Sequence, residues 1–117
     1  MRNEITWRPT KYVQRAGRWR TSLDSHEVGV GSRLISDAVV KRYDEHLPSC
    51  ARGRLLDLGC GKVPLYGIYR RLTESIICCD WADDVHIDVV SDLAQPLPFA
   101  DAAFDTIILS DVLEHAP

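Results

Sequence analysis

The stretch "RLLDLGCGKVPLYGIYRRL", residues 54–72, constrains the fold more than any other part of the chain. It opens with a short apolar run at residues 54–58, which is typical of a buried strand in a parallel sheet. Two glycines follow, and Pro64 then suits the first turn of a helix. Apolar residues recur in that helix at spacings of three and four, at Leu65, Ile68, Tyr69 and Leu72. The stretch therefore predicts a strand, a glycine turn and a helix.

Three further apolar runs follow the glycine turn, and an amphipathic stretch precedes it. The runs at residues 75–80, 86–90 and 104–110 predict strands, of which the middle one is the shortest. Residues 32–47 predict a helix that Ser32 caps and Pro48 ends. Its apolar stripe, which should pack on the sheet, consists of Leu34, Ile35, Ala38, Val39, Tyr43 and Leu47. Strands that alternate with helices or loops indicate a parallel α/β sheet.

The composition fits one soluble globular domain. The chain has 117 residues, of which 45% are hydrophobic and 26% charged, so it can build a single core. No apolar run approaches the roughly 18 residues that a membrane span needs. The first twenty residues also lack the apolar core of a signal peptide. We therefore expect a cytoplasmic protein with no membrane span.

Charge is distributed unevenly along the chain. Residues 1–54 carry 11 Lys or Arg against 6 Asp or Glu, whereas residues 55–117 carry 3 against 11. The basic part either contacts an anionic substrate or is simply solvated, and the sequence leaves both open. Trp7, Tyr12 and Trp19 lie among the basic residues, as a nucleic-acid surface would require, but this pattern is weak and we expect no nucleic-acid partner. Residues 1–31 are predicted to form a basic N-terminal arm, either a plain surface arm or a lid over the site.

The four cysteines and the four histidines show no metal-ligand spacing. Cys60, Cys78 and Cys79 lie in or beside apolar runs, which favours buried, reduced thiols. We therefore expect no metal site.

Polar residues gather at the ends of the predicted strands. They are Asp57, Gly59 and Gly61, then Asp80, then Asp92, and finally Ser110 and Asp111. Ligands of an open parallel sheet bind beyond the carboxyl ends of its strands, so these residues should meet in one cleft. The glycines either let the backbone approach a ligand or serve only the turn. Asp80 can accept two ribose hydroxyls, and the alternative is an acid that caps a turn.

Two common phosphate-binding patterns do not fit the glycine turn. A Walker loop needs Ser or Thr after Gly-Lys, but Val63 follows Lys62. The dinucleotide pattern G-x-G-x-x-G needs a third glycine where Pro64 stands. Asp57 precedes the turn, and its carboxylate favours a cationic group over a pyrophosphate. The pattern therefore indicates a nucleoside ligand that carries a positive charge.

The motifs, taken in order, resemble one enzyme family. "LLDLGCGKVP", "CCDWA" and "SDLAQPLPFADAAFDTIILSDVLEHAP" are similar to the class I S-adenosylmethionine-dependent methyltransferases, especially the small-molecule group, over residues 54–117. The resemblance implies an α/β, Rossmann-like parallel sheet that is partial, with about four of the usual seven strands, preceded by the N-terminal arm and helix. It also implies S-adenosylmethionine as the cofactor and methyl transfer from its sulfonium to a nucleophile of the acceptor.

The resemblance also assigns roles to individual residues. Asp57 would lie near the methionine amine of the cofactor, Asp80 would bind the ribose and Asp92 the exocyclic amine of adenine. His115 is the candidate general base, and the alternative is a histidine that only caps or packs at the start of the helix after the fourth strand. The expected cofactor-binding residues are Asp57, Gly59, Cys60, Gly61, Asp80, Trp81, Asp92, Leu93 and Ser110.

The chain departs from the family pattern in three places. Val63 occupies the third glycine position, and the segment between Asp80 and Asp92 is too short for a helix and a strand, so Trp81 or Ala82 would lie against adenine. The chain also stops in the loop after the fourth strand, which leaves residues 104–110 as an open apolar edge. We expect residues 32–117 to be a truncated methyltransferase domain from a longer enzyme. The alternative is a shortened homologue that pairs this edge in a homodimer.

The expected function is methyl transfer to a small-molecule acceptor, or to a glycan or lipid precursor. Much of the acceptor-binding wall in this family comes from the part beyond the fourth strand, so we expect the 117-residue chain to lack turnover even where it binds the cofactor. A non-catalytic binding or regulatory module that retains the fold is the alternative.

Overall fold

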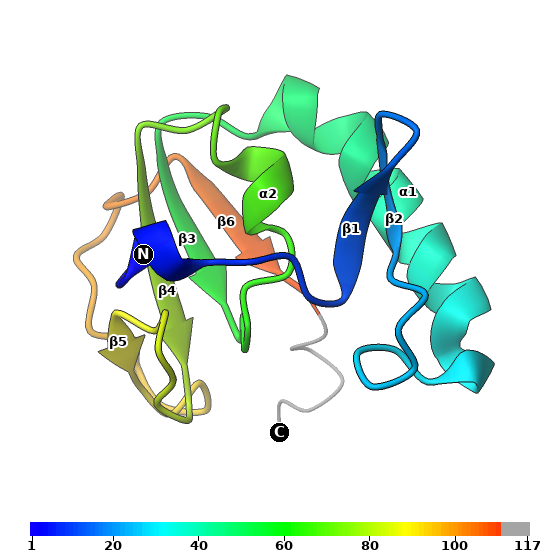
Figure 1. Cartoon of the computed structure of the whole chain (residues 1–117). Helices are drawn as coiled ribbons and strands as arrows, with labels where there is room; N and C mark the ends of the chain where they lie inside the picture. Colours follow the sequence, from blue (N-terminus) through cyan, green and yellow to red (C-terminus); the bar gives the residue numbers. More distant parts are fainter. Residues whose placement is uncertain (111–117) are drawn as a thin grey trace.

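The computed structural model describes residues 1–110 and contains a parallel sheet of four strands (Figure 1). The strand order is β5-β4-β3-β6. The strands are β3 (Arg54–Leu58), β4 (Ser75–Asp80), β5 (Val89–Val90) and β6 (Thr106–Leu109). This is a partial Rossmann-like α/β fold, which confirms the predicted fold class. The predicted ranges of the first two strands are also confirmed, whereas β5 and β6 are shorter than predicted.

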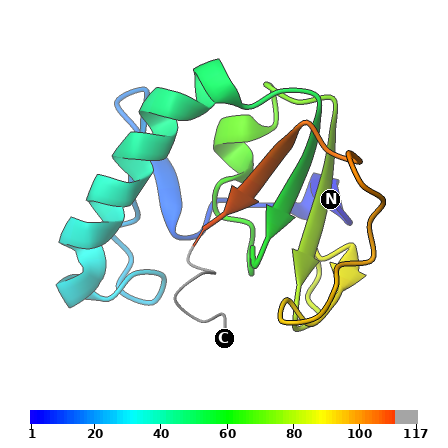
Figure 2. The same cartoon turned by 180° about the vertical axis from the view of Figure 1, so that it is seen from behind.

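The central strand β3 is buried on both faces. Leu55 belongs to the main core and is fully buried, and Leu56, 2% exposed, packs in a second cluster on the opposite face. Asp57 aligns with Cys78 of β4 and with Ile108 of β6. The strand forms here because a continuous apolar run can bury both faces of a parallel sheet. β6 is the edge of the sheet nearest to α1 (Arg33–Cys50), as the view from behind shows (Figure 2).

The N-terminal segment contains a hairpin that the sequence analysis did not predict. After the 3₁₀ turn η1 (Glu4–Thr6), strands β1 (Tyr12–Arg15) and β2 (Arg18–Thr21) pair in antiparallel fashion. Ala16 and Gly17 connect them with φ angles of 52° and 75°, the conformation of a two-residue type I′ turn. Trp7 and Tyr12 are 6% and 1% exposed, so neither can stack on bases. The segment is therefore anchored in the core, and its movement as a lid stays a prediction.

Helix α1 begins after the 3₁₀ turn η2 (Val30–Ser32). Its inward face matches the predicted stripe at Tyr43 and Leu47, which pack in the main core, and differs from it at the start of the helix. Leu34 and Ile35 are 84% and 70% exposed, whereas the buried residues are Ser36, Val40 and Leu47. The predicted start is confirmed, because Ser32 is the N-cap residue, although its side chain makes no cap hydrogen bond. The predicted end is wrong, because Pro48 lies inside the helix, which continues to Cys50.

Two acids of α1 explain why the start of the helix presents a different face to the core from the predicted one. Asp37 accepts a hydrogen bond from the backbone N–H of Thr21 (3.0 Å), and Asp44 accepts one from the backbone N–H of Trp19 (3.4 Å). A spacing of seven residues places both acids on one face of the helix. The N–H groups of an edge strand need partners, so this contact directs the face toward β2. The Thr21 N–H also lowers the pKa of Asp37.

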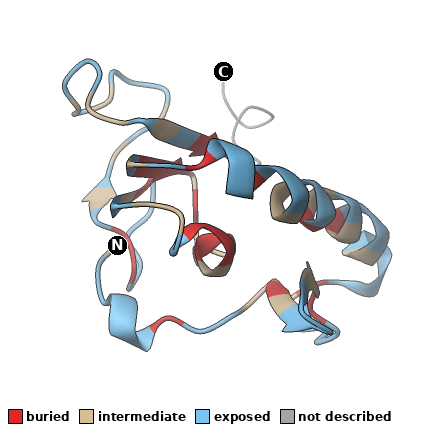
Figure 3. Cartoon of the chain, turned by 90° about the horizontal axis from the view of Figure 1, so that it is seen from above, coloured by how far each residue is buried: buried red, intermediate tan, exposed pale blue. Residues whose placement is uncertain are grey.

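The short helix α2 (Tyr66–Tyr69) lies between the sheet and the N-terminal segment (Figure 3). Tyr66, Ile68 and Tyr69 are buried, in agreement with the predicted apolar spacing, although the helix is shorter than expected. The Trp19 ring of β2 packs against Gly67. A Cβ atom at Gly67 would lie 2.2 Å from Cη2 of Trp19. The hairpin therefore docks on α2 through a contact that only glycine permits.

Gly67→Ala is expected to lower the free energy of unfolding by about 1–3 kcal/mol, because the added methyl group overlaps the Trp19 ring. Helix propensity alone would give the opposite sign, a gain of roughly 1 kcal/mol. Urea unfolding measures the difference. Gly29→Ala is the control, since its Cβ would meet nothing within 4 Å. A Gly67→Ala variant as stable as the parent chain would contradict the docking contact.

Candidate functional site

A cavity of about 280 Å³ opens at the carboxyl ends of β3 and β6. Its walls come from the glycine turn after β3, from Ser110 after β6, and from the N-terminal segment. The lining residues are Lys11, His26, Glu27, Asp57, Gly59, Cys60, Gly61, Lys62, Pro64, Leu65 and Ser110. Five predicted cofactor-binding residues are thus brought together: Asp57, Gly59, Cys60, Gly61 and Ser110.

The glycine turn keeps its left-handed backbone even where glycine is missing. Gly59 and Gly61 have φ angles of 67° and 53°, and Val63, at the third glycine position, has 55°. This conformation is strained for a β-branched residue and persists only where the surroundings enforce it. Trp7 Nε1–H donates to the Val63 carbonyl (3.1 Å), and the Val63 N–H donates to the Cys60 carbonyl (2.8 Å). The N-terminal segment therefore helps to hold the turn.

The backbone amides of both glycines of the turn are already engaged within the protein. The Gly59 N–H donates to the Cys79 carbonyl, and the Gly61 N–H donates to Oδ2 of Asp80, both at 2.8 Å. A phosphate site would need such amides to point at the ligand. The carboxylates of Asp57 and Asp80 beside the turn instead suit a ligand group that carries a positive charge, and Lys11 and Lys62 in the cavity wall suit a carboxylate of the same ligand.

Asp57 lies beneath the cavity and is 1% exposed. Its Oδ2 accepts a hydrogen bond from the Tyr69 hydroxyl at 2.8 Å. Burial raises the pKa of Asp57 to about 7; the Tyr69 hydrogen bond acts in the opposite direction, and the charge of Asp80 adds to the rise. A cation in the cavity would favour the ionised form of this carboxyl group.

Asp80 ends β4 and is 8% exposed. Besides the Gly61 N–H, it accepts the backbone N–H of Trp81 at Oδ1 (2.8 Å). These contacts match the alternative of an acid that caps a turn. Each carboxylate oxygen still has a second acceptor position, so ribose binding stays a prediction. The Trp81 side chain is 74% exposed just beyond the end of the strand.

Two of the predicted adenine residues, Asp92 and Leu93, lie in the loop after β5. Neither these two nor Asp80 and Trp81 line this cavity. Asp92 is exposed, and its Oδ1 accepts the Ala94 N–H at 2.9 Å. Leu93 packs on the second apolar cluster, beside Leu56. The Ser91 N–H donates to the Asp80 carbonyl (2.9 Å), which connects the loop to the end of β4. The role of Asp92 at adenine stays a prediction, and His115 lies outside the described residues.

Six residues of the cavity wall were not predicted as site residues. Lys62, Pro64 and Leu65 lie between the glycine turn and α2, whereas Lys11, His26 and Glu27 come from the N-terminal segment. Glu27 Oε2 lies 3.7 Å from Lys62 Nζ, and this ion pair joins the N-terminal segment to the glycine turn. The only sequence feature that could have indicated the residues of the N-terminal segment was the basic composition of residues 1–54. Composition alone does not show where this segment passes over the sheet.

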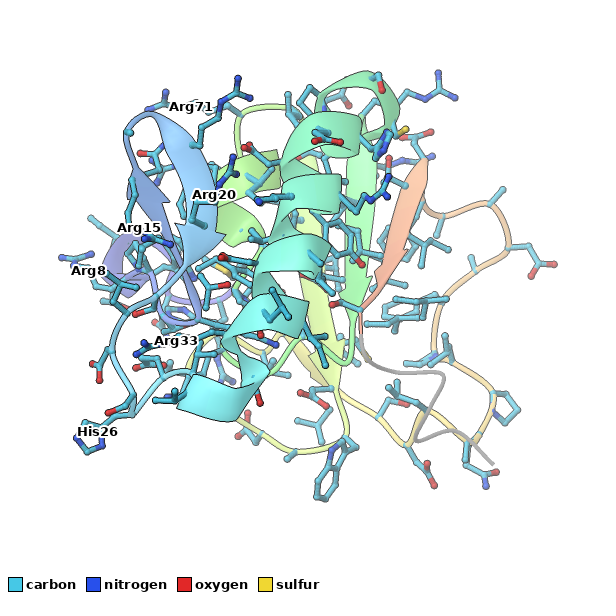
Figure 4. The ribbon with its side chains drawn as sticks, turned by 90° about the vertical axis from the view of Figure 1, so that its right-hand side faces the viewer. Arg8, Arg15, Arg20, His26, Arg33 and Arg71 are labelled. Carbon is cyan, nitrogen blue, oxygen red and sulfur yellow. The ribbon has the colours of Figure 1, made fainter. Side chains whose placement is uncertain are left out.

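Arg8, Arg15, Arg20 and Arg33 lie on the side that carries the hairpin and α1 (Figure 4), whereas Arg2 pairs with Asp83 in the segment after β4. Arg20 Nη1 lies 3.6 Å from Oδ2 of Asp44, and Arg15 Nη2 donates to the Thr21 carbonyl (3.0 Å). The acids of α1 therefore offset part of the positive charge predicted for this half of the chain.

The thiol groups near the cavity are protonated at neutral pH. The hydrogen bond with Cys78 and burial raise the pKa of Cys60 well above its usual value, and burial also raises that of Cys79. A protonated thiol is a poor nucleophile. Within residues 1–110, no three His, Cys, Asp or Glu side chains are placed to hold a metal ion. In the same part of the chain, no helix has the length and apolarity to cross a membrane.

Comparison with known proteins agrees with this geometry. A family model described as a methyltransferase domain matches residues 56–117, more than half of the chain. The match begins in β3 and includes the glycine turn, Asp80 and Asp92. A search of curated proteins and a search of solved structures gave no match. Members of the matched family generally bind S-adenosylmethionine. The chain therefore belongs to the methyltransferase-domain family of the class I, S-adenosylmethionine-dependent type.

Proposed function

We propose that this chain is the cofactor-binding part of a longer methyltransferase, which transfers a methyl group to a small molecule or to a glycan or lipid precursor. The family match supports methyl transfer as the general activity. The observation that supports this cleft as the cofactor site is the cavity at the strand ends, which Asp57, the glycine turn and Ser110 line together. The buried carboxylate of Asp57 suits the ammonium group in the methionine part of S-adenosylmethionine.

The residues of the cleft fit S-adenosylmethionine, which when bound supplies a methyl group on a good leaving group, the sulfonium. Asp57 would pair with the amino group and Asp80 would accept hydrogen bonds from the ribose hydroxyls. Asp92, Leu93 and Trp81 would contact the adenine. Gly59, Cys60 and Gly61 would form the wall beside the methionine part. The chain's contribution to the reaction is thus mainly to orient the cofactor and exclude water, and His115 is the proposed base for acceptors that lose a proton.

The free edge of β6 supports the proposal that the sheet extends beyond the described residues. Ile107 and Leu109 are 55% and 44% exposed. Among residues 1–110, β3 is the only strand that pairs with β6. An apolar edge of this kind is normally covered. We propose that it pairs either with further strands of a longer enzyme or with a second copy of this chain.

Calorimetric titration of the 117-residue chain with S-adenosylhomocysteine tests the proposal. We expect binding near micromolar affinity, roughly −8 kcal/mol. Adenosine 5′-triphosphate is the matched control, because it shares the nucleoside but carries phosphates in place of the amino-acid part, and it should bind at least a hundredfold more weakly. A folded chain that binds neither ligand, or that prefers the triphosphate, would contradict the proposal. Binding without methyl transfer in the full-length protein would favour the non-catalytic module.

A further inference from the structure

The Tyr69 hydroxyl reaches Asp57 from beneath the cavity. Tyr69 is the last residue of α2 and is fully buried in the main core. Its hydroxyl donates to Oδ2 of Asp57 at 2.8 Å. The Tyr69 hydroxyl and Oδ2 of Asp57 are both buried, and each thus provides the other with a hydrogen-bond partner.

The other carboxyl oxygen is not satisfied in the same way. Among the described residues, no hydrogen bond joins a donor to Oδ1 of Asp57, although Asp57 lines the cavity. A buried carboxylate with one hydrogen bond remains costly until a second donor or a cation meets it. A ligand that carries an ammonium group can supply that partner from the cavity.

The surroundings of Asp57 offer little other compensation. Asp80 at the end of β4 opposes its ionisation, and the thiols of Cys60 and Cys78 face the Asp57–Tyr69 pair from the glycine turn and from β4. The charged groups that line the cavity are Lys11, His26, Glu27 and Lys62. Of these, Lys62 pairs with Glu27. Tyr69 is the group that holds the carboxyl group from the protein side.

We propose that Tyr69 is a positioning residue, which fixes Oδ2 of Asp57 and thereby directs Oδ1 toward the amino group of the cofactor's methionine part. This inference rests on the proposed function. It assigns to α2 a role in cofactor recognition, although Tyr69 itself is not among the residues that line the cavity.

The affinity of the site for the cofactor should depend on pH. Because burial raises the pKa of Asp57 to about 7, the carboxylate forms between about pH 6 and 8, and affinity for an ammonium ligand should rise through this window. The Tyr69 hydrogen bond stabilises the carboxylate, so its removal should move the rise to higher pH. 5′-Methylthioadenosine lacks the amino-acid part, so its affinity should not follow this profile.

Tyr69→Phe keeps the buried ring and removes only the hydroxyl. We expect the affinity for S-adenosylhomocysteine to fall about tenfold at pH 7 and its pH profile to shift upward, while 5′-methylthioadenosine binds as before. Tyr66→Phe is the matched control, because Tyr66 lies in the same helix but its hydroxyl contacts Glu4. Titration of both ligands from pH 5.5 to 9 measures these effects.

The outcomes separate this inference from the proposed function. If the parent chain binds neither ligand, the proposed function fails and the inference fails with it. If the parent chain binds both and Tyr69→Phe leaves the profile for S-adenosylhomocysteine unchanged, only the inference is overturned. Should Tyr69→Phe not fold, Asp57→Asn provides the second test. It must remove the pH dependence for S-adenosylhomocysteine, and a profile that persists would overturn the inference.

Discussion

Asp80→Ala is expected to weaken the binding of S-adenosylhomocysteine at least a hundredfold while the chain stays folded. Two ribose hydroxyls that donate to one carboxylate contribute about 1.5–3 kcal/mol each, so their combined loss exceeds about two orders of magnitude in affinity. The variant also loses the hydrogen bonds from the Gly61 and Trp81 N–H groups. That loss should lower the free energy of unfolding by about 1–3 kcal/mol. Calorimetric titration and urea unfolding measure the two effects separately.

Asp84→Ala is the matched control for Asp80→Ala. Asp84 also accepts the N–H of the following residue, Val85 (2.7 Å), but it is exposed, whereas Asp80 is buried and also accepts the Gly61 N–H of the glycine turn. This variant should retain the affinity of the parent chain. A 2′,3′-dideoxy analogue, which lacks both ribose hydroxyls, separates ribose contact from support of the glycine turn, because it should bind the parent chain more weakly but lose nothing further in Asp80→Ala. Unchanged affinity of Asp80→Ala for S-adenosylhomocysteine would refute the ribose assignment.

The sheet could be predicted from the sequence because its strands are marked by local patterns. The run that forms β3 is apolar apart from Asp57, the run that forms β4 is apolar from residue 76 to 79, and both are bounded by glycine or by charged residues. Strands buried on both faces need this composition wherever they occur. β5 contains only Val89 and Val90, too little for a periodic signal, so its predicted range was too long.

The face of α1 could not be predicted in the same way. The expected stripe counted only apolar residues, whereas the observed inward face includes Ser36, Asp37 and Asp44. The two acids turn inward because they accept N–H groups from β2. The β1–β2 hairpin, with four residues in each strand, was itself not predicted. A polar contact between two segments distant in the sequence leaves no periodic signal in either one.

The candidate site was predictable to the extent that strand ends mark it. Asp57, Gly59, Cys60, Gly61 and Ser110 line one cavity as expected. The partner of Asp57 was not predicted, because the spacing of Tyr69 shows only that its ring is buried and not where its hydroxyl points. Lys11, His26 and Glu27 were missed because they reach the cavity through the path of the N-terminal segment. That path depends on core contacts of Trp7 and Tyr12.

Asp57→Asn is expected to stabilise the fold at pH 8 while it weakens cofactor binding. The pKa of Asp57 is about 7 in the folded chain, against an ordinary value of 3.8. Below pH 3.8 both folded and unfolded chains hold the proton, so the full stability is present. As the pH rises, the unfolded chain releases its proton first, and stability falls until the pH passes 7. A shift of this size corresponds to a loss of up to about 4 kcal/mol.

Asparagine removes this loss and keeps the packing. Its side-chain oxygen can still accept the Tyr69 hydroxyl, but it cannot ionise. The difference in unfolding free energy between Asp57→Asn and the parent chain should therefore grow from pH 4.5 to pH 8, as urea titrations at both values would show. Asp105→Asn provides the contrast, because the Arg54 N–H lowers the pKa of Asp105, so this variant should gain nothing at pH 8.

The same variant tests why the chain retains a buried acid. Asp57→Asn should lose its preference for S-adenosylhomocysteine over 5′-methylthioadenosine, since the amide cannot form an ion pair with the amino group. Higher stability together with lower affinity would identify Asp57 as a group retained for ligand binding despite its effect on folding. A variant that is less stable than the parent chain at pH 8 would show that the carboxylate is compensated within the protein. In that case Asp57 would belong to the folding core and the cleft would need another partner for the ligand's positive charge.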